Sequence, residues 1–273
     1  MASINPDTIQ RYGRDGVVAL RTVFDTEWLA LLQQGIDHNL QAPSPRFEAR
    51  PSVDSPARYY EDFWVWSLFS EFERFVRDSP VAEIAAQLMD ANRINLVMDN
   101  WFLQEAGAQA RAPWHHDISY FDFEGTLCVV WVPLEATDRD EGIEFIRGSH
   151  LWNRLFTRVW FKDHQPAAAD GWVNGKHYEH VPDIDGHRDD YDIVSFDLEA
   201  GDCLVFDIRM LHAGTHQPPA KTAHRYSVRL SAEDGHIHYR GDWAKSERQY
   251  FEAFGHGEGD SLNSEFFPVL WET

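Results

Sequence analysis

The chain contains 273 residues, and its 24 basic and 45 acidic side chains give a formal net charge of −21 at pH 7. Nucleic-acid binding depends on Lys and Arg side chains that neutralise phosphates, so this balance argues against a nucleic-acid partner. No apolar stretch approaches the roughly 20 residues that cross a bilayer. The N-terminus also lacks the basic and apolar regions of a signal peptide, so no membrane association is expected.

Residues 1–93 are expected to form a helical and aromatic part of the chain. Residues 16–20 are typical of a short strand. An aspartate opens the segment 25–40, in which apolar residues recur at every fourth position, and this pattern predicts a capped helix. A second helix is predicted over 79–88, with proline at its first position. The segment 43–66 is rich in Pro, Arg and aromatic residues; it is expected to be a loop above an aromatic cluster, and the alternative is the mouth of a pocket.

From residue 94 the sequence changes to short apolar runs that are bounded by turn residues. Runs of this length at fairly regular spacing predict a mainly β fold of the sandwich or jelly-roll type, with flanking helices. The runs cover residues 94–103, 115–123, 126–134, 143–147, 193–197, 202–208 and 225–231. Cys128 and Cys203 lie inside two of them and are expected to be reduced core residues of a cytoplasmic protein.

A single domain over residues 1–273 is expected, because no linker or internal repeat divides the chain. Its jelly-roll core would cover residues 94–235, and a C-terminal extension would cover 236–273. The segment 151–192 is long for a connection between strands. Such insertions in compact domains are usually functional, so it is predicted to be a lid-like insertion, at least partly ordered by its tryptophans.

The chemistry centres on a His-x-Asp pair, His115 and Asp117, and on the distant His212. Alternate residues of a strand point to the same face, so His115 and Asp117 can hold one metal ion together. His212 from a distant strand would complete the set. Two histidines and one carboxylate, with three positions left open, are the ligands of Fe(II) oxygenases. The alternative is a histidine at a strand edge followed by a turn-forming aspartate, since such short pairs also arise by chance.

Three polar residues alternate along the predicted strand 225–231. Arg225, Ser227 and Arg229 would share one face of it. An arginine that points into a β core needs an anion, because an unpaired buried guanidinium is very costly. A dicarboxylate cosubstrate would supply that anion, and guanidinium binds carboxylate through two parallel hydrogen bonds.

Several segments in order resemble the phytanoyl-CoA dioxygenase family of Fe(II)/2-oxoglutarate oxygenases, over roughly residues 10 to 270. They are WHHDISY (114–120), VWVPL (130–134), EGIEFIRGSH (141–150), the segment 201–214 with GD at its start and HAG at its end, and GDSLNSEFFP (259–268). The resemblance implies a double-stranded β-helix, the cupin-like jelly roll, with helices packed outside. It also implies a dioxygenase that uses Fe(II), 2-oxoglutarate and O2 on a small organic molecule and releases succinate and CO2.

By this resemblance, His115, Asp117 and His212 are the iron ligands. Arg225 is implied to bind the C5 carboxylate of 2-oxoglutarate, and Trp131 matches a pocket residue near the cosubstrate. Halogenases related to the family replace the ligand carboxylate with a small residue. The presence of Asp117 therefore favours oxygenation, desaturation or ring chemistry, with hydroxylation of an unactivated C–H bond as the leading expectation.

Ser227 is also expected to add a hydrogen bond to the cosubstrate. Three other features depart from the family's pattern. His116 stands where many members have Gln, and Gln104 falls where some carry a Lys that helps to bind 2-oxoglutarate. Arg225 follows the last ligand by about two residues more than expected, which leaves Arg229 as its alternative.

Two other classes of function fit the same residues. The His/Asp/His set could hold Zn(II), with a metal-bound water as the nucleophile of a hydrolase or isomerase. The jelly roll could also be a binding protein without turnover. Conversion of 2-oxoglutarate to succinate with Fe(II) separates the three classes.

Overall fold

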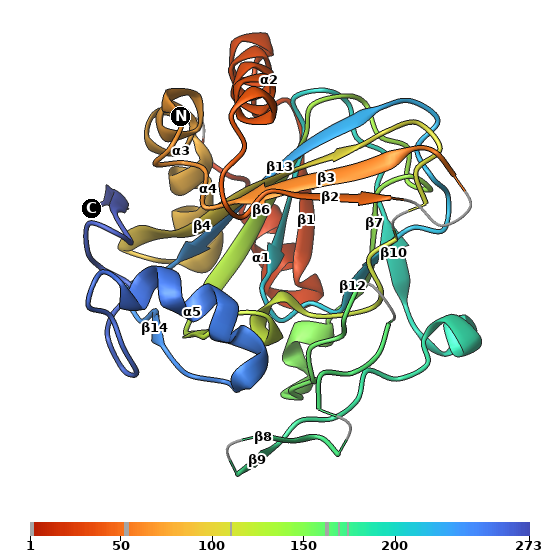
Figure 1. The fold of residues 1–273 in the computed structure, drawn as a ribbon, viewed down its shortest axis with the longest axis vertical. Helices are drawn as coiled ribbons and strands as arrows, with labels where there is room; N and C mark the ends of the chain where they lie inside the picture. Colours follow the sequence, from red (N-terminus) through yellow and green to blue (C-terminus); the bar gives the residue numbers. More distant parts are fainter. Residues whose placement is uncertain (1–2, 52–54, 110, 162–163, 169, 174) are drawn as a thin grey trace.

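Two antiparallel sheets form the body of the computed structural model, which describes residues 3–51, 55–109, 111–161, 164–168, 170–173 and 175–273 (Figure 1). The larger sheet runs in the order β1 (Val17–Leu20), β11 (Cys203–Asp207), β6 (Leu127–Pro133), β13 (Ala223–Ser231), β4 (Arg93–Gln104), β3 (Arg58–Phe63) and β2 (Glu48–Pro51). Strand β15 (Val269–Glu272) also pairs with β4. The smaller sheet has the order β10 (Ile193–Ser195), β7 (Ile143–Ile146) and β12 (His212–Gly214).

The two sheets pack through their inner faces. Phe145 of β7 lies with its ring 5.0 Å from that of Phe206 of β11, and both are buried in one apolar cluster with Val129 and Trp131 of β6. Two facing antiparallel sheets around an inner core confirm the predicted jelly roll. Two short pairs lie outside the sheets: β5 (Phe123–Glu124) with β14 (His236–Ile237), and β8 (Trp172–Val173) with β9 (Lys176–His177).

Helices cover the outer face of the larger sheet. They are α1 (Pro6–Asp15), α2 (Thr26–Gln41), α3 (Ser70–Asp78) and α4 (Val81–Met89), and their apolar residues join the strands' outward side chains in one buried cluster. Helix α5 (Lys245–Glu252) instead packs Phe251 into the inner core, 5.7 Å from the ring of Phe123. No helix within the described ranges is long and apolar enough to cross a membrane.

Strand β13 shows how the alternation of side chains builds both layers. Tyr226 points outward, where its ring stacks on Phe72 of α3 at 5.1 Å. Arg225, Ser227 and Arg229 lie on the inner face, as the sequence predicted, and Ser227 pairs in register with Trp131 of β6. All three polar residues are buried, so this face brings charge into the space between the sheets.

Most predicted elements are confirmed. The helix over 25–40 is α2, and Asp25 caps it by accepting hydrogen bonds from the backbone N–H groups of Glu27 and Trp28. In α4, Pro80 is the N-cap residue and not the first helical residue. The predicted runs 94–103, 126–134, 143–147, 193–197, 202–208 and 225–231 each contain a strand. Cys128 and Cys203 are buried free thiols.

Two predictions were wrong. Residues 115–123 do not form a strand: His115 makes one isolated bridge, and the chain then turns into the 3-10 helix η1 (Asp117–Ser119). The segment 43–66 is not simply a loop, because it contains the β2–β3 hairpin at the sheet edge. Charged residues and proline are common at sheet edges, where they discourage further pairing, so this strand pair lacks the apolar pattern of a central strand.

The segment 151–192 is tied to the rest of the fold, although residues 162–163, 169 and 174 within it lie outside the described part. It contains the 3-10 helices η2 (Ser149–Trp152, at its start) and η3 (Asp185–Asp190). Tyr178 is fully buried against Trp243 of η4 (Asp242–Ala244), with ring centroids 5.6 Å apart. The lid function of this segment stays a prediction.

Candidate metal centre

The three predicted ligands come together between the sheets. His115 and His212 exchange backbone hydrogen bonds: each N–H donates to the other's carbonyl, at 2.9 and 2.8 Å. Asp117, at the start of η1, then places its Oδ1 3.4 Å from Nε2 of His115 and 3.6 Å from Nε2 of His212. All three side chains are buried, and their donor atoms lie within 4.8 Å of one another.

Backbone carbonyls orient both imidazoles. Nδ1 of His115 lies 2.7 Å from the carbonyl oxygen of Pro113, and Nδ1 of His212 lies 2.9 Å from that of Met210. A carbonyl oxygen can only accept, so each Nδ1 carries a proton, and Nε2 is the ring nitrogen that can bind a metal. Histidines that bind metals have this arrangement, in which the outer hydrogen bond fixes the tautomer and the direction of the ring.

The charges around the ligands also suit a cation. Burial by itself would raise the pKa of Asp117, but Arg229 and the two histidines outweigh burial and hold that pKa well below its usual range. Burial, together with the neighbouring His115, lowers the pKa of His212 to about 3. The carboxylate is therefore ionised and His212 is neutral at ordinary pH, which are the protonation states that bind a metal. The residues present thus fit a bound divalent ion.

Arg229 holds the second oxygen of Asp117. Its Nε donates a hydrogen bond to Oδ2 at 2.9 Å, and its Nη2 lies 2.7 Å from the same oxygen. Its Nη1 donates to Oδ1 of Asn100 on β4 at 2.7 Å, and the guanidinium lies 5.3 Å from the centre of the Phe121 ring. The sequence predicted that an arginine facing inward needs an anion. For Arg229, that anion is Asp117.

Arg225 lies farther along the same face of β13 with a different set of neighbours. Its Nη2 donates to the backbone carbonyl of Glu141 at 3.1 Å, and its Nη1 is 3.5 Å from Oε1 of Gln104. The guanidinium also lies 5.6 Å from the centre of the Trp131 ring. Within the described part of the chain no carboxylate forms an ion pair with Arg225, although its side chain is only 7% exposed.

The environment of Arg225 is correspondingly unfavourable for its charge. Burial lowers its pKa, and the more distant Tyr59, Glu135 and Glu141 compensate only in part. An unpaired buried guanidinium is costly, and a bound anion would offset that cost.

The side chain of His116 has no contact with Arg225 among the described residues. Its ring faces the insertion, where Nε2 lies 3.2 Å from the backbone nitrogen of Phe156 and 3.3 Å from its carbonyl oxygen. Burial lowers the pKa of His116 to about 3, so the ring is neutral. The predicted contact of His116 with a cosubstrate stays a prediction that this geometry does not support.

The sequence reading missed three residues that shape the centre. Asn100 fixes Arg229, and the rings of Tyr120 and Phe161 lie 5.2 and 5.1 Å from that of His115. Asn100 could have been found as a polar residue inside the apolar run 94–103. The two aromatic residues carry no comparable pattern, because their position depends on the turn after η1 and on the insertion.

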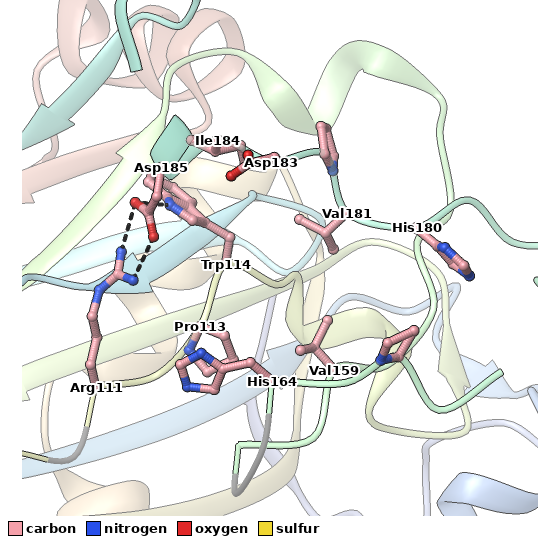
Figure 2. A pocket seen from close by; sticks show the side chains of 12 residues that line it. Arg111, Pro113, Trp114, Val159, His164, His180, Val181, Asp183, Ile184 and Asp185 are labelled. Carbon is pink, nitrogen blue, oxygen red and sulfur yellow. Dashed lines mark hydrogen bonds and ion pairs between the residues drawn. The ribbon is translucent and has the colours of Figure 1, made fainter. Parts of the chain in front are cut away.

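A cavity of about 350 Å³ opens beside Pro113 and Trp114, just before the first ligand (Figure 2). One wall is a closed polar network. Arg111 binds both oxygens of Asp185, at 2.7 and 3.1 Å, and the indole nitrogen of Trp114 donates to Asp185 at 3.0 Å. Arg111 and Asp185 satisfy each other here, so neither is left with an unpaired charge.

A second group of donor side chains gathers at Glu144, Asp185 and His216. Arginines already occupy it: Arg111 lies 3.1 Å from Glu144, and Arg188 lies 2.6 Å from the other oxygen of the same carboxylate. Two guanidinium groups neutralise these carboxylates, so the group is an ion-pair network and does not resemble the centre at Asp117.

Comparisons with known structures agree with this fold. Among solved structures, the chain is similar to the alpha-ketoglutarate-dependent carbocyclase SnoK from nogalamycin biosynthesis, at 15% identity and a TM-score of 0.74, over 97% of this chain and 96% of that one. The epimerase SnoN in complex with Fe3+, alpha ketoglutarate and nogalamycin RO is 21% identical, with a TM-score of 0.71 and coverage of 97% of both chains. EvdO2 from Micromonospora carbonacea var. aurantiaca, complexed with 2-oxoglutarate, is 15% identical, with a TM-score of 0.61 over 88% of this chain and 96% of its own.

The TM-scores of these three structures establish a shared fold. A search of the curated proteins finds no significant match. The model of the family described as phytanoyl-CoA dioxygenase (PhyH) matches residues 12–217. That range is most of the chain and contains His115, Asp117 and His212, and the chain belongs to the phytanoyl-CoA dioxygenase family.

Proposed function

We propose that the protein is an Fe(II)- and 2-oxoglutarate-dependent oxygenase that hydroxylates a C–H bond of a small organic molecule. His115 and His212 would hold the iron through Nε2, and Asp117 would hold it through Oδ1. With 2-oxoglutarate and O2, the bound iron supplies the oxidation of the C–H bond, and succinate and CO2 are released. The observation that carries the proposal is the pairing of this donor set with Arg225, a buried cation that lacks a carboxylate partner among the described residues.

Arg225 would bind the C5 carboxylate of 2-oxoglutarate. A guanidinium and a carboxylate form a strong charge-assisted pair, and the anion would repay the burial of the arginine. Gln104 lies beside Nη1 of Arg225, Trp131 lies along its guanidinium, and Ser227 follows it on the same face. The ion pair of Arg229 with Asp117 supports Arg225 over Arg229 for this role.

The number of protein donors also matters. Because Arg229 holds Oδ2 of Asp117, only Oδ1 faces the two imidazoles. The two histidines and one carboxylate oxygen would therefore hold the metal, and a set of this kind would leave room for small molecules to bind it.

Oxidative ring chemistry is the second candidate. The similar structures SnoK and SnoN are described as a carbocyclase and an epimerase, so this fold accommodates outcomes other than hydroxylation. We favour hydroxylation because it is the simplest outcome with the ligand carboxylate in place. We also place the reaction in the cytoplasm, in keeping with the free thiols of Cys128 and Cys203, and expect no nucleic-acid or membrane partner.

Turnover of 2-oxoglutarate tests the proposal. Purified protein supplied with Fe(II), ascorbate and 2-oxoglutarate should release succinate slowly without a substrate, and a panel of small metabolites should reveal one that accelerates the release. Mass spectrometry of that reaction then separates a gain of one oxygen from ring closure or epimerisation. If 2-oxoglutarate is untouched with Fe(II) while Zn(II) confers hydrolysis, the protein is a zinc enzyme and the proposal is wrong.

A further inference from the structure

A cavity of about 250 Å³ lies next to the metal centre. None of the three ligands lines it, but Tyr120 and Phe121, which follow η1, both do. The ring of Tyr120 lies 5.2 Å from that of His115, and the ring of Phe121 lies 5.3 Å from the guanidinium carbon of Arg229. A molecule in this cavity would therefore lie one side chain away from the iron ligands and from the arginine that holds Asp117.

Aromatic rings from four parts of the chain line the cavity. Besides Tyr120 and Phe121, these are Phe47, Phe63 and Trp64 at the end of β3, and Tyr250 on α5, with the Trp64 and Tyr250 rings 5.3 Å apart. Aromatic walls favour flat rings, through offset stacking and edge-to-face contacts. The volume is below the roughly 300–1,000 Å³ of pockets for drug-sized ligands, so it suits a compact ring system and not an acyl-CoA thioester.

Arg46 differs from the other charged residues of the cavity wall. Glu48 lies 2.7 Å from Arg50, and Glu247 lies 3.6 Å from Arg158. No carboxylate in the described part of the chain pairs with Arg46. It is therefore the one arginine of the wall that keeps its charge available for a ligand, in a protein whose net charge is −21.

Neutral groups hold Arg46 in place. Its Nε donates to the carbonyl oxygen of Phe63 at 2.7 Å, and its Nη2 donates to that of Trp64 at 3.1 Å. Its guanidinium carbon lies 4.9 Å from the centre of the Tyr250 ring. The group is half-buried and lines the cavity, where its guanidinium could also donate hydrogen bonds to an anion.

From these observations we propose that this cavity binds the primary substrate and that the substrate is a compact aromatic molecule with one acidic group, which Arg46 binds. The proposal rests on the proposed oxygenase function, because it assigns the substrate class of the same centre. It does not concern the cosubstrate, which has its own cation in Arg225.

Three matched probes test the class by isothermal titration calorimetry on the full chain with Mn(II) and 2-oxoglutarate. These are 2-naphthoate, its neutral counterpart 2-naphthylmethanol, and the non-aromatic cyclohexanecarboxylate. The aromatic acid should bind about tenfold or more tightly than either of the other two, since it alone offers both the ring and the charge. Equal affinity for the neutral alcohol or the non-aromatic acid, or no binding of 2-naphthoate, overturns the proposal.

Variants then assign the charge to Arg46. Arg46→Gln should weaken 2-naphthoate by about tenfold and leave 2-naphthylmethanol unchanged, whereas Arg46→Lys should keep most of the preference for the acid. Arg74→Gln is the control, because Arg74 is exposed and lies over Trp28, outside the cavity. A purely structural role of Arg46 would weaken both probes together and would contradict the assignment.

The succinate assay without substrate separates this proposal from the function beneath it. If the protein converts 2-oxoglutarate but shows no preference for the aromatic acid, the proposed oxygenase function stands and the proposed substrate class is wrong. If the protein does not convert 2-oxoglutarate, the proposed oxygenase function is wrong, whichever of the probes bind.

Discussion

Arg229 binds Oδ2 of Asp117 through two nitrogens, Nε at 2.9 Å and Nη2 at 2.7 Å. The other carboxylate oxygen, Oδ1, faces both histidines. The contact joins β13 of the larger sheet to the turn that carries the ligand. It fixes the direction of the carboxylate and keeps it ionised before iron arrives. The contact therefore helps to arrange the donor set.

Replacement of Arg229 should weaken metal binding. Groups that orient metal ligands typically contribute about 10–100-fold in affinity, so Arg229→Gln should raise the dissociation constant for Mn(II) or Co(II) within that range. Arg229→Lys should fall between this variant and the natural protein, because it keeps the charge but loses the two-pronged contact. Calorimetric titration measures both. An unchanged metal affinity in Arg229→Gln would show that Asp117 needs no such support.

Arg225 should have the complementary effect. Arg225→Gln removes a charge-assisted pair worth about 1.5–3 kcal/mol, so the KM for 2-oxoglutarate should rise at least tenfold. Metal affinity should stay the same, because Arg225 has no contact with the ligands. Measurement of both constants for Arg225→Gln and Arg229→Gln gives a crossed design. If Arg229 instead controls the KM for 2-oxoglutarate, the roles assigned to the two arginines are exchanged.

Loss of a ligand should stop turnover, but the two kinds of ligand should differ in their effect on stability. His115→Ala and Asp117→Ala each leave the ion with two protein donors, so succinate release should fall to background. Asp117→Ala also leaves Arg229 buried without its partner, which typically costs about 3–5 kcal/mol. Urea unfolding of the metal-free proteins should therefore show a larger loss of stability for Asp117→Ala than for His115→Ala.

A double variant checks the cause of that loss. Asp117→Ala combined with Arg229→Met removes both members of the pair, so part of the lost stability should return. If the double variant is less stable than Asp117→Ala alone, the unpaired charge of Arg229 is not the reason for the destabilisation.

The inner face of β13 was predictable because a strand alternates with a period of two. That period places Arg225, Ser227 and Arg229 together from the sequence alone. The sequence could not say which arginine meets which anion. That outcome depends on where η1 turns, and the turn is fixed by the bridge between His115 and His212, two residues far apart in the chain.

The hairpin at the edge of the larger sheet was missed for another physical reason. Central strands are buried on both faces and appear as apolar runs, whereas β3 turns Tyr59 and Glu61 inward and places Tyr60 on the other face. Its pattern therefore resembles a polar loop. The strand forms because its partner β4 offers a long row of backbone groups, which is a property of the assembled sheet and not of the segment.

Glu61 on this hairpin should give the fold a dependence on pH. The carboxyl is buried next to Tyr59, whose hydroxyl donates to it at 3.1 Å, and Arg50 pairs with its other oxygen. Burial raises the pKa of Glu61 to about 7, and Arg50 opposes the shift only in part. An unfolded glutamate has a pKa of roughly 4.3, so between that pH and about 7 the native state holds more protons than the unfolded state. Stability must then fall as the pH rises through this window.

Glu61→Gln removes this ionisation. The free energy of unfolding of the variant should therefore rise relative to that of the natural protein from about pH 4.5 upward and level off above about pH 7, with a total difference of no more than roughly 4 kcal/mol. Urea unfolding at several pH values measures the difference between the two proteins. Burial also raises the pKa of Asp99 to about 6, but the contribution of Asp99 is the same in both proteins and cancels in this difference. Glu73→Gln, which removes an exposed carboxylate that pairs with Arg77 on α3, is the control and should follow the natural protein. Parallel pH profiles for Glu61→Gln and the natural protein would mean that Arg50 keeps the buried carboxylate fully ionised in the native state.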